Sequence, residues 1–273
     1  YEPGAQMMVS SFAKDVSGNK FFVKGHLHES WETGEPDTVN SSFINEFLAG
    51  RIGNYIGANT PQSYIIQRSA KDVAIGSNVR SNLSEPFEIA TSVVPSSHSL
   101  DPEYMRTLVL MSDNPYKTIE ELFDGLVDYS RTTPALNAVM GNSDLHYNNI
   151  LWSNATKKFN QIDFNEAKPV SLKRAPGIPT THPKVRDALV IAKSSMALVR
   201  EALNDSVSAA LENQLLSQSQ QLALIGRMNA SGFKLTANKN ATDPLSDTVL
   251  DITTTQDYTK LFEKIASSDG ENY

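Results

Sequence analysis

Three carboxylate or amide side chains and one imidazole have the types and spacing from which a catalytic site could be built. They are Asp144, His146, Asn149 and Asp163. The first three lie in a polar segment, residues 141–152, between an expected helix and an expected strand. Two short apolar runs flank a polar turn after Asn149, and such a hairpin would bring Asn149 and Asp163 to neighbouring positions. Two oxygen ligands beside a further carboxylate, that of Asp144, suit a hard divalent cation that keeps waters and binds phosphate oxygens.

The elements upstream of this segment are mostly predicted strands. Two apolar runs surround residues 16–19, where Gly and Asn tolerate positive φ, so they should form a β-hairpin. A helix should follow, because apolar residues recur at near-helical spacing between a good N-cap and a glycine stop. The predicted elements are strands at residues 7–13, 20–24, 63–67 and 73–76, and a helix from Asn40 or Ser41 to Gly57.

The character of the chain changes from about residue 80. Ser, Pro and Asn interrupt residues 81–102, and helical patterns dominate after them. We therefore expect an α+β chain, with a small strand-rich lobe at residues 1–78 and a larger helical lobe at residues 79–273 that contains one hairpin. The elements predicted for the second lobe are helices at residues 118–129, 134–140 and 184–228, a hairpin of residues 150–152 and 159–162, and two short helices in the tail.

The motif Asp144-x-His146-x-x-Asn149, followed by I-D-F at residues 162–164, resembles the catalytic and metal loops of one branch of the kinase-like superfamily. This is the phosphatidylinositol 3-/4-kinase and HipA-like branch. The resemblance implies a two-lobed, protein-kinase-like fold with ATP in the cleft between the lobes. It also implies that Asp144 orients or deprotonates the attacking hydroxyl, with His146 as a second catalytic group. Asn149 and Asp163 would hold the Mg²⁺ or Mn²⁺ ions that bridge the nucleotide phosphates.

The resemblance extends upstream to the expected nucleotide site. Lys24 ends an apolar strand, from which a lysine could reach the α- and β-phosphates. Glu46 lies on the helix that follows and could form the ion pair that positions Lys24. Gly4 and Gln6 precede the first strand, where the turn that covers the nucleotide would stand. Residues 76–79 would form the hinge that holds the adenine.

The sequence departs from the family pattern at three places. Leu145 stands where these relatives usually carry Arg, and Asn165 replaces the Gly of D-F-G. The expected nucleotide-covering turn is also poor in glycine. The first two departures bear on the identity of the substrate and the rate of transfer more than on metal binding. The third bears on how the nucleotide phosphates would be bound.

A basic segment follows the predicted metal loop. Residues 167–186 contain no acidic residue, in a chain whose net charge is −7. In kinase-like enzymes this segment meets the substrate, so its charge would favour an anionic partner: a phosphoinositide headgroup, an inositol phosphate or a phosphorylated peptide. A solvated loop with chance charge is the alternative. The basic residues are Lys168, Lys173, Arg174, Lys184 and Arg186, with His182 among them.

Length and composition exclude several other classes of protein. The 273 residues are 40% hydrophobic and 20% charged, which predicts a packed core. The acidic balance, with a pI near 5.3, argues against a general nucleic-acid binder. The absence of cysteine excludes disulfides, thiolate metal sites and cysteine nucleophiles. No apolar run approaches the ~20 residues of a membrane helix, and no signal-peptide pattern opens the chain, so we expect a soluble intracellular protein.

These observations together lead us to expect an ATP-dependent phosphotransferase. A protein Ser/Thr hydroxyl is the first choice of acceptor, because HipA-like relatives phosphorylate proteins. A phosphoinositide acceptor stays open, supported by the D-F pair and the basic segment, as do a pseudokinase, an inositol-phosphate-binding module and the transfer of ADP-ribose or AMP. The chain opens at Tyr1 rather than Met, so we expect a piece of a longer protein. The resemblance also suggests a secreted bacterial protein that acts in a host cell.

Overall fold

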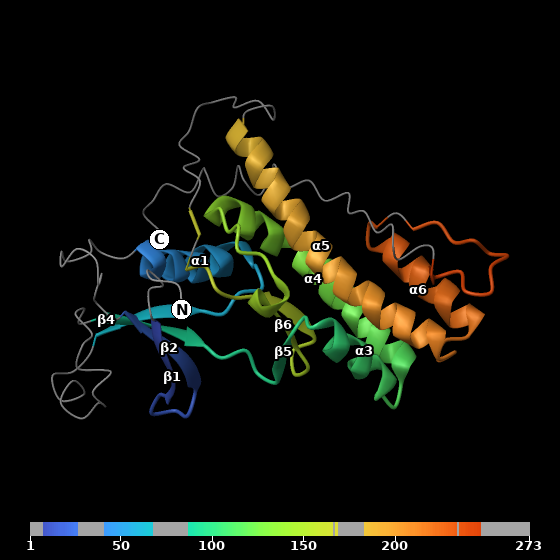
Figure 1. Cartoon of the computed structure of the whole chain (residues 1–273), viewed down its shortest axis with the longest axis horizontal. Helices are drawn as coiled ribbons and strands as arrows, with labels where there is room; N and C mark the ends of the chain where they lie inside the picture. The colour runs from blue at the N-terminus through green and yellow to red at the C-terminus, as the bar shows by residue number, and fades with distance from the viewer. Residues whose placement is uncertain are drawn as a thin grey trace, which may run out of the picture.

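In the described residues, antiparallel strands and helix α1 build the N-terminal part of the chain, and long helices build most of the remainder (Figure 1). The α+β class expected from the sequence is thereby confirmed, with a small strand-rich lobe followed by a larger helical lobe. Among the described residues, no helix is long and apolar enough to cross a membrane. The structure is a computed structural model, and it describes residues 8–26, 41–67, 87–165, 167–168, 183–233 and 235–246.

A four-stranded antiparallel sheet, in the order β1-β2-β4-β3, forms the N-terminal lobe. Strand β2 is central, since it pairs with β1 on one side and with β4 on the other. Lys24 of β2 therefore lies between Ser10 of β1 and Ile89 of β4, and ladders on both sides hold its backbone. The strands are β1 (Met8–Lys14), β2 (Lys20–His26), β3 (Ser63–Gln67) and β4 (Phe87–Ser92).

The turn between β1 and β2 is held by one carboxylate. Asp15 accepts hydrogen bonds from the backbone N of Ser17 (2.9 Å) and from the backbone N of Asn19 (2.8 Å). Gly18 adopts a φ of 85°, which a residue with a side chain rarely does. The hairpin predicted around residues 16–19 is confirmed, and its turn fixes the register that places Lys24.

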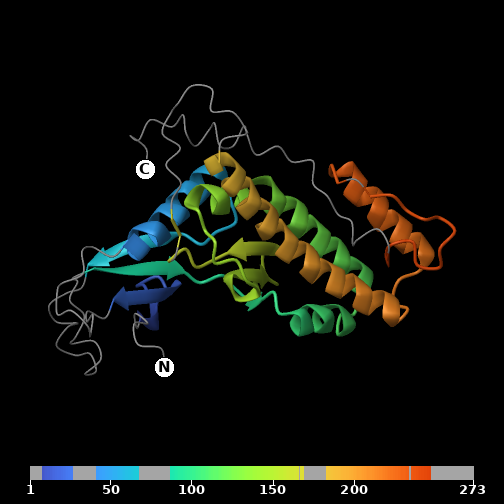
Figure 2. The same cartoon turned by 45° about the horizontal axis from the view of Figure 1, so that its top comes forward.

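Helix α1 (Ser41–Ile56) packs against the sheet through β3 and β4 (Figures 1 and 2). The contact is close because α1 carries glycine where it meets β3. A Cβ added at Gly50 would lie 2.8 Å from the backbone N of Ser63. The helix ends where the sequence predicts, before Gly57, whose φ is 73°.

Two long helices, α4 and α5, lie side by side and form the axis of the helical lobe (Figures 1 and 2). Helix α3 packs against α5, and α6 contacts α4. A three-stranded antiparallel sheet, in the order β5-β6-β7, contacts α4 through β7. The elements are β5 (Ser97–Ser99), α3 (Pro102–Leu110), α4 (Pro115–Met140), η2 (Tyr147–Asn149), β6 (Ile150–Ser153), β7 (Lys158–Gln161), α5 (Pro183–Glu212) and α6 (Gln218–Ala230).

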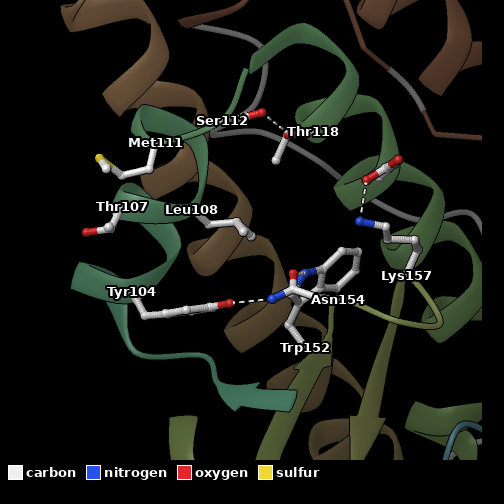
Figure 3. A pocket seen from close by; sticks show the side chains of 10 residues that line it. Tyr104, Thr107, Leu108, Met111, Ser112, Thr118, Trp152, Asn154 and Lys157 are labelled. Carbon is white, nitrogen blue, oxygen red and sulfur yellow. Dashed lines mark hydrogen bonds and ion pairs between the residues drawn. The ribbon is translucent and has the colours of Figure 1, made fainter. Parts of the chain in front are cut away.

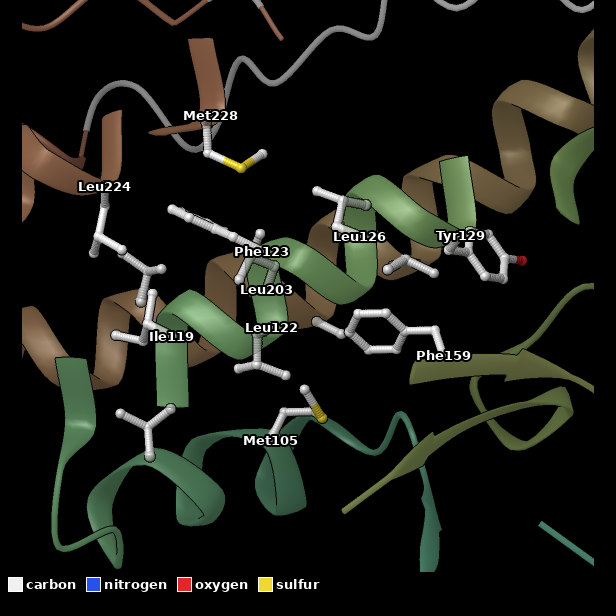
Figure 4. Close-up of a cluster of buried hydrophobic side chains, with 14 of the residues drawn as sticks. Met105, Ile119, Leu122, Phe123, Leu126, Tyr129, Phe159, Leu203, Leu224 and Met228 are labelled. Atoms are coloured by element: carbon white, nitrogen blue, oxygen red, sulfur yellow. The ribbon is translucent and has the colours of Figure 1, made fainter. Parts of the chain in front are cut away.

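The core of the helical lobe gathers apolar side chains from the helices and from β7 (Figure 4). Each large side chain buried there contributes about 1.5–3 kcal/mol relative to an exposed one. Packing is close at Gly125 of α4, where an added Cβ would lie 2.8 Å from Cζ3 of Trp152. The fully buried members in Figure 4 include Met105, Ile119, Leu122, Phe123, Leu126, Tyr129, Phe159, Leu203 and Leu224.

The loop after α1 is bonded to the helical lobe. Asn59 donates through Nδ2 to Oδ2 of Asp128 (2.9 Å) and through its backbone N to Oγ1 of Thr133 (3.0 Å), and both acceptors lie on α4. The carbonyl of Asn59 accepts from the backbone N of Gln161 at the end of β7 (2.8 Å). Helix α1 is therefore attached to both lobes.

The helices differ from the sequence expectation at two points. The helices predicted at residues 118–129 and 134–140 are one helix, α4, with Pro134 inside it. The missing N–H of proline costs one helical hydrogen bond, but residues 133–140 are all buried, and their packing outweighs that loss. The helix predicted at residues 184–228 is two helices, because Ser217 starts α6 with a capping box.

Three short elements were not predicted: β4, β5 and α3. Strand β4 pairs with both β2 and β3, so the N-terminal sheet draws on residues up to 92, beyond the predicted lobe boundary at residues 78 and 79. The strand predicted at residues 73–76 lies outside the described residues.

Candidate active site

Lys24, Glu46 and Asp163 come together from a strand, a helix and a loop. The Nζ atom of Lys24 lies 2.7 Å from Oε1 of Glu46 on α1. It also lies 3.2 Å from Oδ1 of Asp163, which follows β7. Lys24 is 8% exposed and Glu46 is 4% exposed. A buried ammonium therefore bridges two carboxylates, and one of them is the Glu46 partner that the sequence predicts.

Burial and charge act in opposite directions on this pair. Burial lowers the pKa of Lys24, but the charges of Glu46 and Asp163 outweigh burial and raise that pKa overall. Burial also raises the pKa of Glu46, and the nearby Lys24 opposes the rise. The raised pKa of Lys24 favours a charged pair, whereas the raised pKa of Glu46 favours a neutral carboxyl group. Lys24 is charged at neutral pH, because its Nζ contacts two carboxylates rather than one.

The loop that contains Asp144 leaves α4 through a left-handed glycine. Gly141 caps the helix with a φ of 61°, and this turns the chain sharply. Asn142 then bonds back to α4, since its backbone N donates to the carbonyl of Asn137 (2.9 Å). Farther along, Nδ2 of Asn149 donates to Oδ2 of Asp144 (3.0 Å) and to its carbonyl (2.9 Å). These bonds close the loop and hold the first and last residues of the D-x-H-x-x-N motif together.

His146 completes the motif on the open side of this loop. Its Nε2 lies 3.5 Å from Oδ1 of Asp144, and its Nδ1 accepts from the backbone N of Asn148 (3.3 Å). The side chains of Asp144 and His146 are 38% and 48% exposed, so a substrate can reach both. The hydroxyl of Tyr147 donates to Oε2 of Glu201 on α5 (2.7 Å), and this bond raises the pKa of Tyr147 to about 12. The loop is thereby anchored to α5.

The β6–β7 hairpin brings Asn149 close to Asp163, as the sequence predicts. Ile150 pairs with Gln161, and the backbone N of Ile162 donates to the carbonyl of Asn149 (2.9 Å). Asp163 follows with a φ of 59°, in the left-handed region that Asp tolerates better than most residues. The two predicted metal ligands are therefore carried by hydrogen-bonded neighbours at the end of the hairpin.

Phe164 fixes the loop of Asp163 against α1 and α4. Its side chain is 1% exposed and packs in a cluster with Ala49 of α1 and Leu136 and Met140 of α4. Its backbone N donates to Oε1 of Glu46 (3.3 Å), the atom that also contacts Lys24. The carboxylate of Glu46 thus connects the strand lysine to the loop of Asp163.

The oxygen atoms of this site suit a hard cation held by few protein ligands. Both described bonds of Asn149 to Asp144 use Nδ2, and its Oδ1 has no hydrogen bond within the described part of the chain. No group of three or more His, Asp and Glu side chains there is placed to hold a metal ion. The Asp163 carboxylate and the Asn149 amide would therefore share an ion with waters and phosphate oxygens, which is the way proteins bind Mg²⁺.

The remaining predicted site residues fall into two groups. Lys168 is exposed, and its backbone N donates to the carbonyl of Gly141 (3.3 Å), so the basic segment begins beside the Asp144 loop. The predicted nucleotide-turn residues, the hinge at 76–79, His182 and two basic residues predicted to meet an anionic partner lie outside the described ranges. The turn residues are Gly4 and Gln6, and the two basic residues are Lys173 and Arg174.

A pocket of about 400 Å³ lies elsewhere in the helical lobe (Figure 3). Tyr104 and Met111 from the α3 region, Trp152 of β6 and Lys157 of the hairpin turn are among its lining residues. No predicted site residue lines it, so this pocket is separate from the group around Lys24.

Sequence reasoning missed Gln161, which is fully buried two residues before Asp163. Its Nε2 donates to the carbonyl of Asn149 and to the carbonyl of Ile162, the residue directly before Asp163. One sequence signal could have identified Gln161. It is a polar residue at a strand position that the neighbouring apolar residues predict to be buried.

Comparison with known proteins finds no matching family model and no matching curated protein. Among solved structures, the chain is similar to one described as a crystal structure of a Helicobacter pylori proinflammatory kinase, CtkA. That similarity has 10% sequence identity and a TM-score of 0.37, and it covers 92% of this chain and 93% of that chain. An identity and a TM-score this low identify neither the family nor the activity of the chain. Its function has to follow from the site itself.

Proposed function

We propose that the chain is a kinase-like phosphotransferase that moves the γ-phosphoryl group of ATP to a hydroxyl. The observation that carries the proposal is the buried Lys24, whose Nζ bonds to both Glu46 (2.7 Å) and Asp163 (3.2 Å). A lysine held in this way offers a fixed positive charge to nucleotide phosphates, beside a carboxylate that can hold their metal ion. The D-x-H-x-x-N loop, joined to the same hairpin, adds a second carboxylate that a substrate can reach.

Asp144 is the group that would receive the acceptor proton. The hydroxyl oxygen attacks the γ-phosphorus, the bond from that phosphorus to the β–γ bridging oxygen breaks, and ADP leaves. The hydroxyl proton passes to the Asp144 carboxylate. The bond from Nδ2 of Asn149 orients this carboxylate, and His146 lies 3.5 Å from its other oxygen as a second polar group.

Asn149 and Asp163 would hold Mg²⁺ or Mn²⁺, which supplies charge neutralisation at the phosphate oxygens when it is bound. The oxygen chemistry of the two side chains supports this assignment, because hard divalent cations prefer carboxylate and amide oxygens. Nζ of Lys24 lies 3.2 Å from Oδ1 of Asp163, which would place the lysine beside the proposed ion and its phosphate oxygens.

The acceptor that we propose is a Ser or Thr hydroxyl of a protein. Asp144 and His146 are open to solvent at the surface of the helical lobe, as an acceptor on a large partner requires. A phosphoinositide is the second candidate. It is supported by Lys168, which is exposed and begins the basic segment next to Gly141.

The test is transfer of label from γ-labelled ATP with Mn²⁺ or Mg²⁺ to the chain itself, to a generic protein substrate and to phosphoinositide vesicles. We expect labelled protein from the wild-type chain and none from Asp163→Ala, which should also lose metal-dependent ATP binding. Asp113→Ala is the matched control, since Asp113 is an exposed carboxylate in the loop between α3 and α4, and it should leave both properties unchanged.

The other outcomes separate the alternatives. Label on lipid alone would favour the second candidate. Metal-dependent ATP binding without any labelled product would favour a pseudokinase, a missing activator or the transfer of a different group. A wild-type chain whose melting temperature does not respond to ATP with Mn²⁺ or Mg²⁺ would refute the proposed function.

A further inference from the structure

The side chain of Gln161 uses both ends of its amide to join the metal loop to the core. Its Nε2 donates to the carbonyl of Asn149 (2.9 Å) and to the carbonyl of Ile162 (3.1 Å). Its Oε1 accepts from the hydroxyl of Tyr129 (3.1 Å) and from Nδ2 of Asn137 (3.0 Å), both on α4. The residue is 0% exposed. A buried amide whose donor and acceptor atoms are both hydrogen-bonded fixes the positions of the groups that it contacts.

The two carbonyls that Gln161 binds belong to the segments that carry the predicted metal ligands. One is the carbonyl of Asn149 itself, and the other is that of Ile162, directly before Asp163. The carbonyl of Asn149 also accepts from the backbone N of Ile162 (2.9 Å). Mg²⁺ demands near-ideal ligand geometry at about 2.0–2.1 Å, so the relative position of these two segments decides how well the ion is held.

Behind Gln161 the same network reaches α5. Ser195 of α5 is fully buried, and its Oγ contacts the hydroxyl of Tyr129 (2.5 Å) and Nδ2 of Asn137 (2.8 Å). Asn137 also accepts from Nδ2 of Asn142 (3.3 Å), two residues before Asp144. The network therefore has a front side, where Gln161 meets the metal loop, and a back side, where Ser195 supports Tyr129 and Asn137.

We infer that Gln161 is a positioning residue that sets the distance between the metal ligands Asn149 and Asp163, an inference that rests on the proposed function. Gln161 does not touch the ion or the phosphates. It acts by holding two carbonyls at one amide nitrogen, while Tyr129 and Asn137 hold the amide in place. Residues that orient metal ligands from behind typically change metal affinity roughly 10–100-fold when they are mutated.

Two variants separate the front of the network from its back. Gln161→Glu keeps an acceptor for Tyr129 and Asn137, but it places an oxygen opposite the carbonyls of Asn149 and Ile162. Ser195→Ala removes the bonds at the back and leaves the bonds from Gln161 to the two carbonyls. Gln161→Met, which has similar length and no donor, tests the same front contacts if the glutamate variant fails to fold.

The measurement is the rise in melting temperature at fixed ATP as the Mn²⁺ concentration increases, using the whole chain. We expect the half-saturating Mn²⁺ concentration to rise about 10–100-fold in Gln161→Glu and Gln161→Met and less than about twofold in Ser195→Ala. Hydrogen exchange without nucleotide gives a second readout. The backbone amide of Ile162 should exchange faster in the Gln161 variants than in Ser195→Ala.

Three results would overturn the inference. An unchanged Mn²⁺ requirement in the Gln161 variants, with a wild-type chain that responds to Mn²⁺ and ATP, would refute the inference alone. An equal increase in Ser195→Ala would show a general structural role. A wild-type chain that does not respond at all would refute the proposed function and this inference with it.

Discussion

Replacement of Lys24 by methionine should destabilise the chain strongly, because it leaves a buried carboxylate without its partner. Glu46 is 4% exposed, and Lys24 is its ion-pair partner at 2.7 Å. Removing one member of a buried ion pair costs about 3–5 kcal/mol. Asp163 adds little to this figure, because its side chain is 35% exposed and solvent screens it. In a chain of this size the loss corresponds to a fall of about 6–20 °C in melting temperature.

The deficit of Lys24→Met should grow with pH. Burial raises the pKa of Glu46, and without the charge of Lys24 that pKa rises further. A carboxyl with a raised pKa in the folded state binds its proton more tightly there than in the unfolded chain. The variant therefore loses least below the ordinary Glu pKa of 4.5 and loses progressively more as the pH rises through the raised value.

Thermal unfolding followed by circular dichroism at pH 5 and pH 8 measures this effect. Lys20→Met is the matched control, since Lys20 is an exposed lysine on the same strand, and its melting temperature should stay close to that of the wild type. The double variant Lys24→Met/Glu46→Gln removes the stranded charge and should recover much of the loss at pH 8. An equal deficit at both pH values, or no recovery in the double variant, would refute the account of a buried, charge-compensated pair.

Two further predictions concern the reaction and the core. Asp144→Ala should lower label transfer at least ~10²-fold while the melting temperature still rises with ATP and Mn²⁺, and transfer at the wild-type rate would remove Asp144 from its role as base. Gly125→Ala should cost about 1–3 kcal/mol in urea unfolding, because the new Cβ would lie 2.8 Å from the ring of Trp152. Gly226→Ala on the exposed side of α6 has no atom within 4 Å of the new Cβ and should be neutral or stabilising, so equal losses at the two glycines would contradict the packing argument.

Local patterns predicted the elements that carry most of the candidate site. The turn at residues 16–19, the helix that ends before Gly57 and the β6–β7 hairpin follow from glycine, capping and alternation, all of which act over a few residues. These elements are enough to bring Lys24 to Glu46 and Asn149 to the segment before Asp163. The roles of these residues stay predictions, since geometry gives their neighbours and not their chemistry.

Features that depend on distant contacts were not predicted. Strand β4 is recognisable as a strand only through its partners β2 and β3, which are separated from it in sequence. Helix α4 continues through Pro134 because its surroundings are buried, and local propensity opposes this continuation. In the sequence Gln161 is an ordinary polar residue, because its hydrogen-bond partners Tyr129 and Asn137 lie on a distant segment. In each case tertiary packing overrides the local signal.

The bonds of Asn59 have a consequence for how α1 can move. Moving the C-terminal end of α1 away from the helical lobe would require Asn59 to leave Asp128, Thr133 and Gln161. Three hydrogen bonds of about 0.5–1.5 kcal/mol each oppose such a movement, before any packing is lost. This end of α1 is therefore a fixed point, and any movement of Glu46 relative to Lys24 would have to pivot about it.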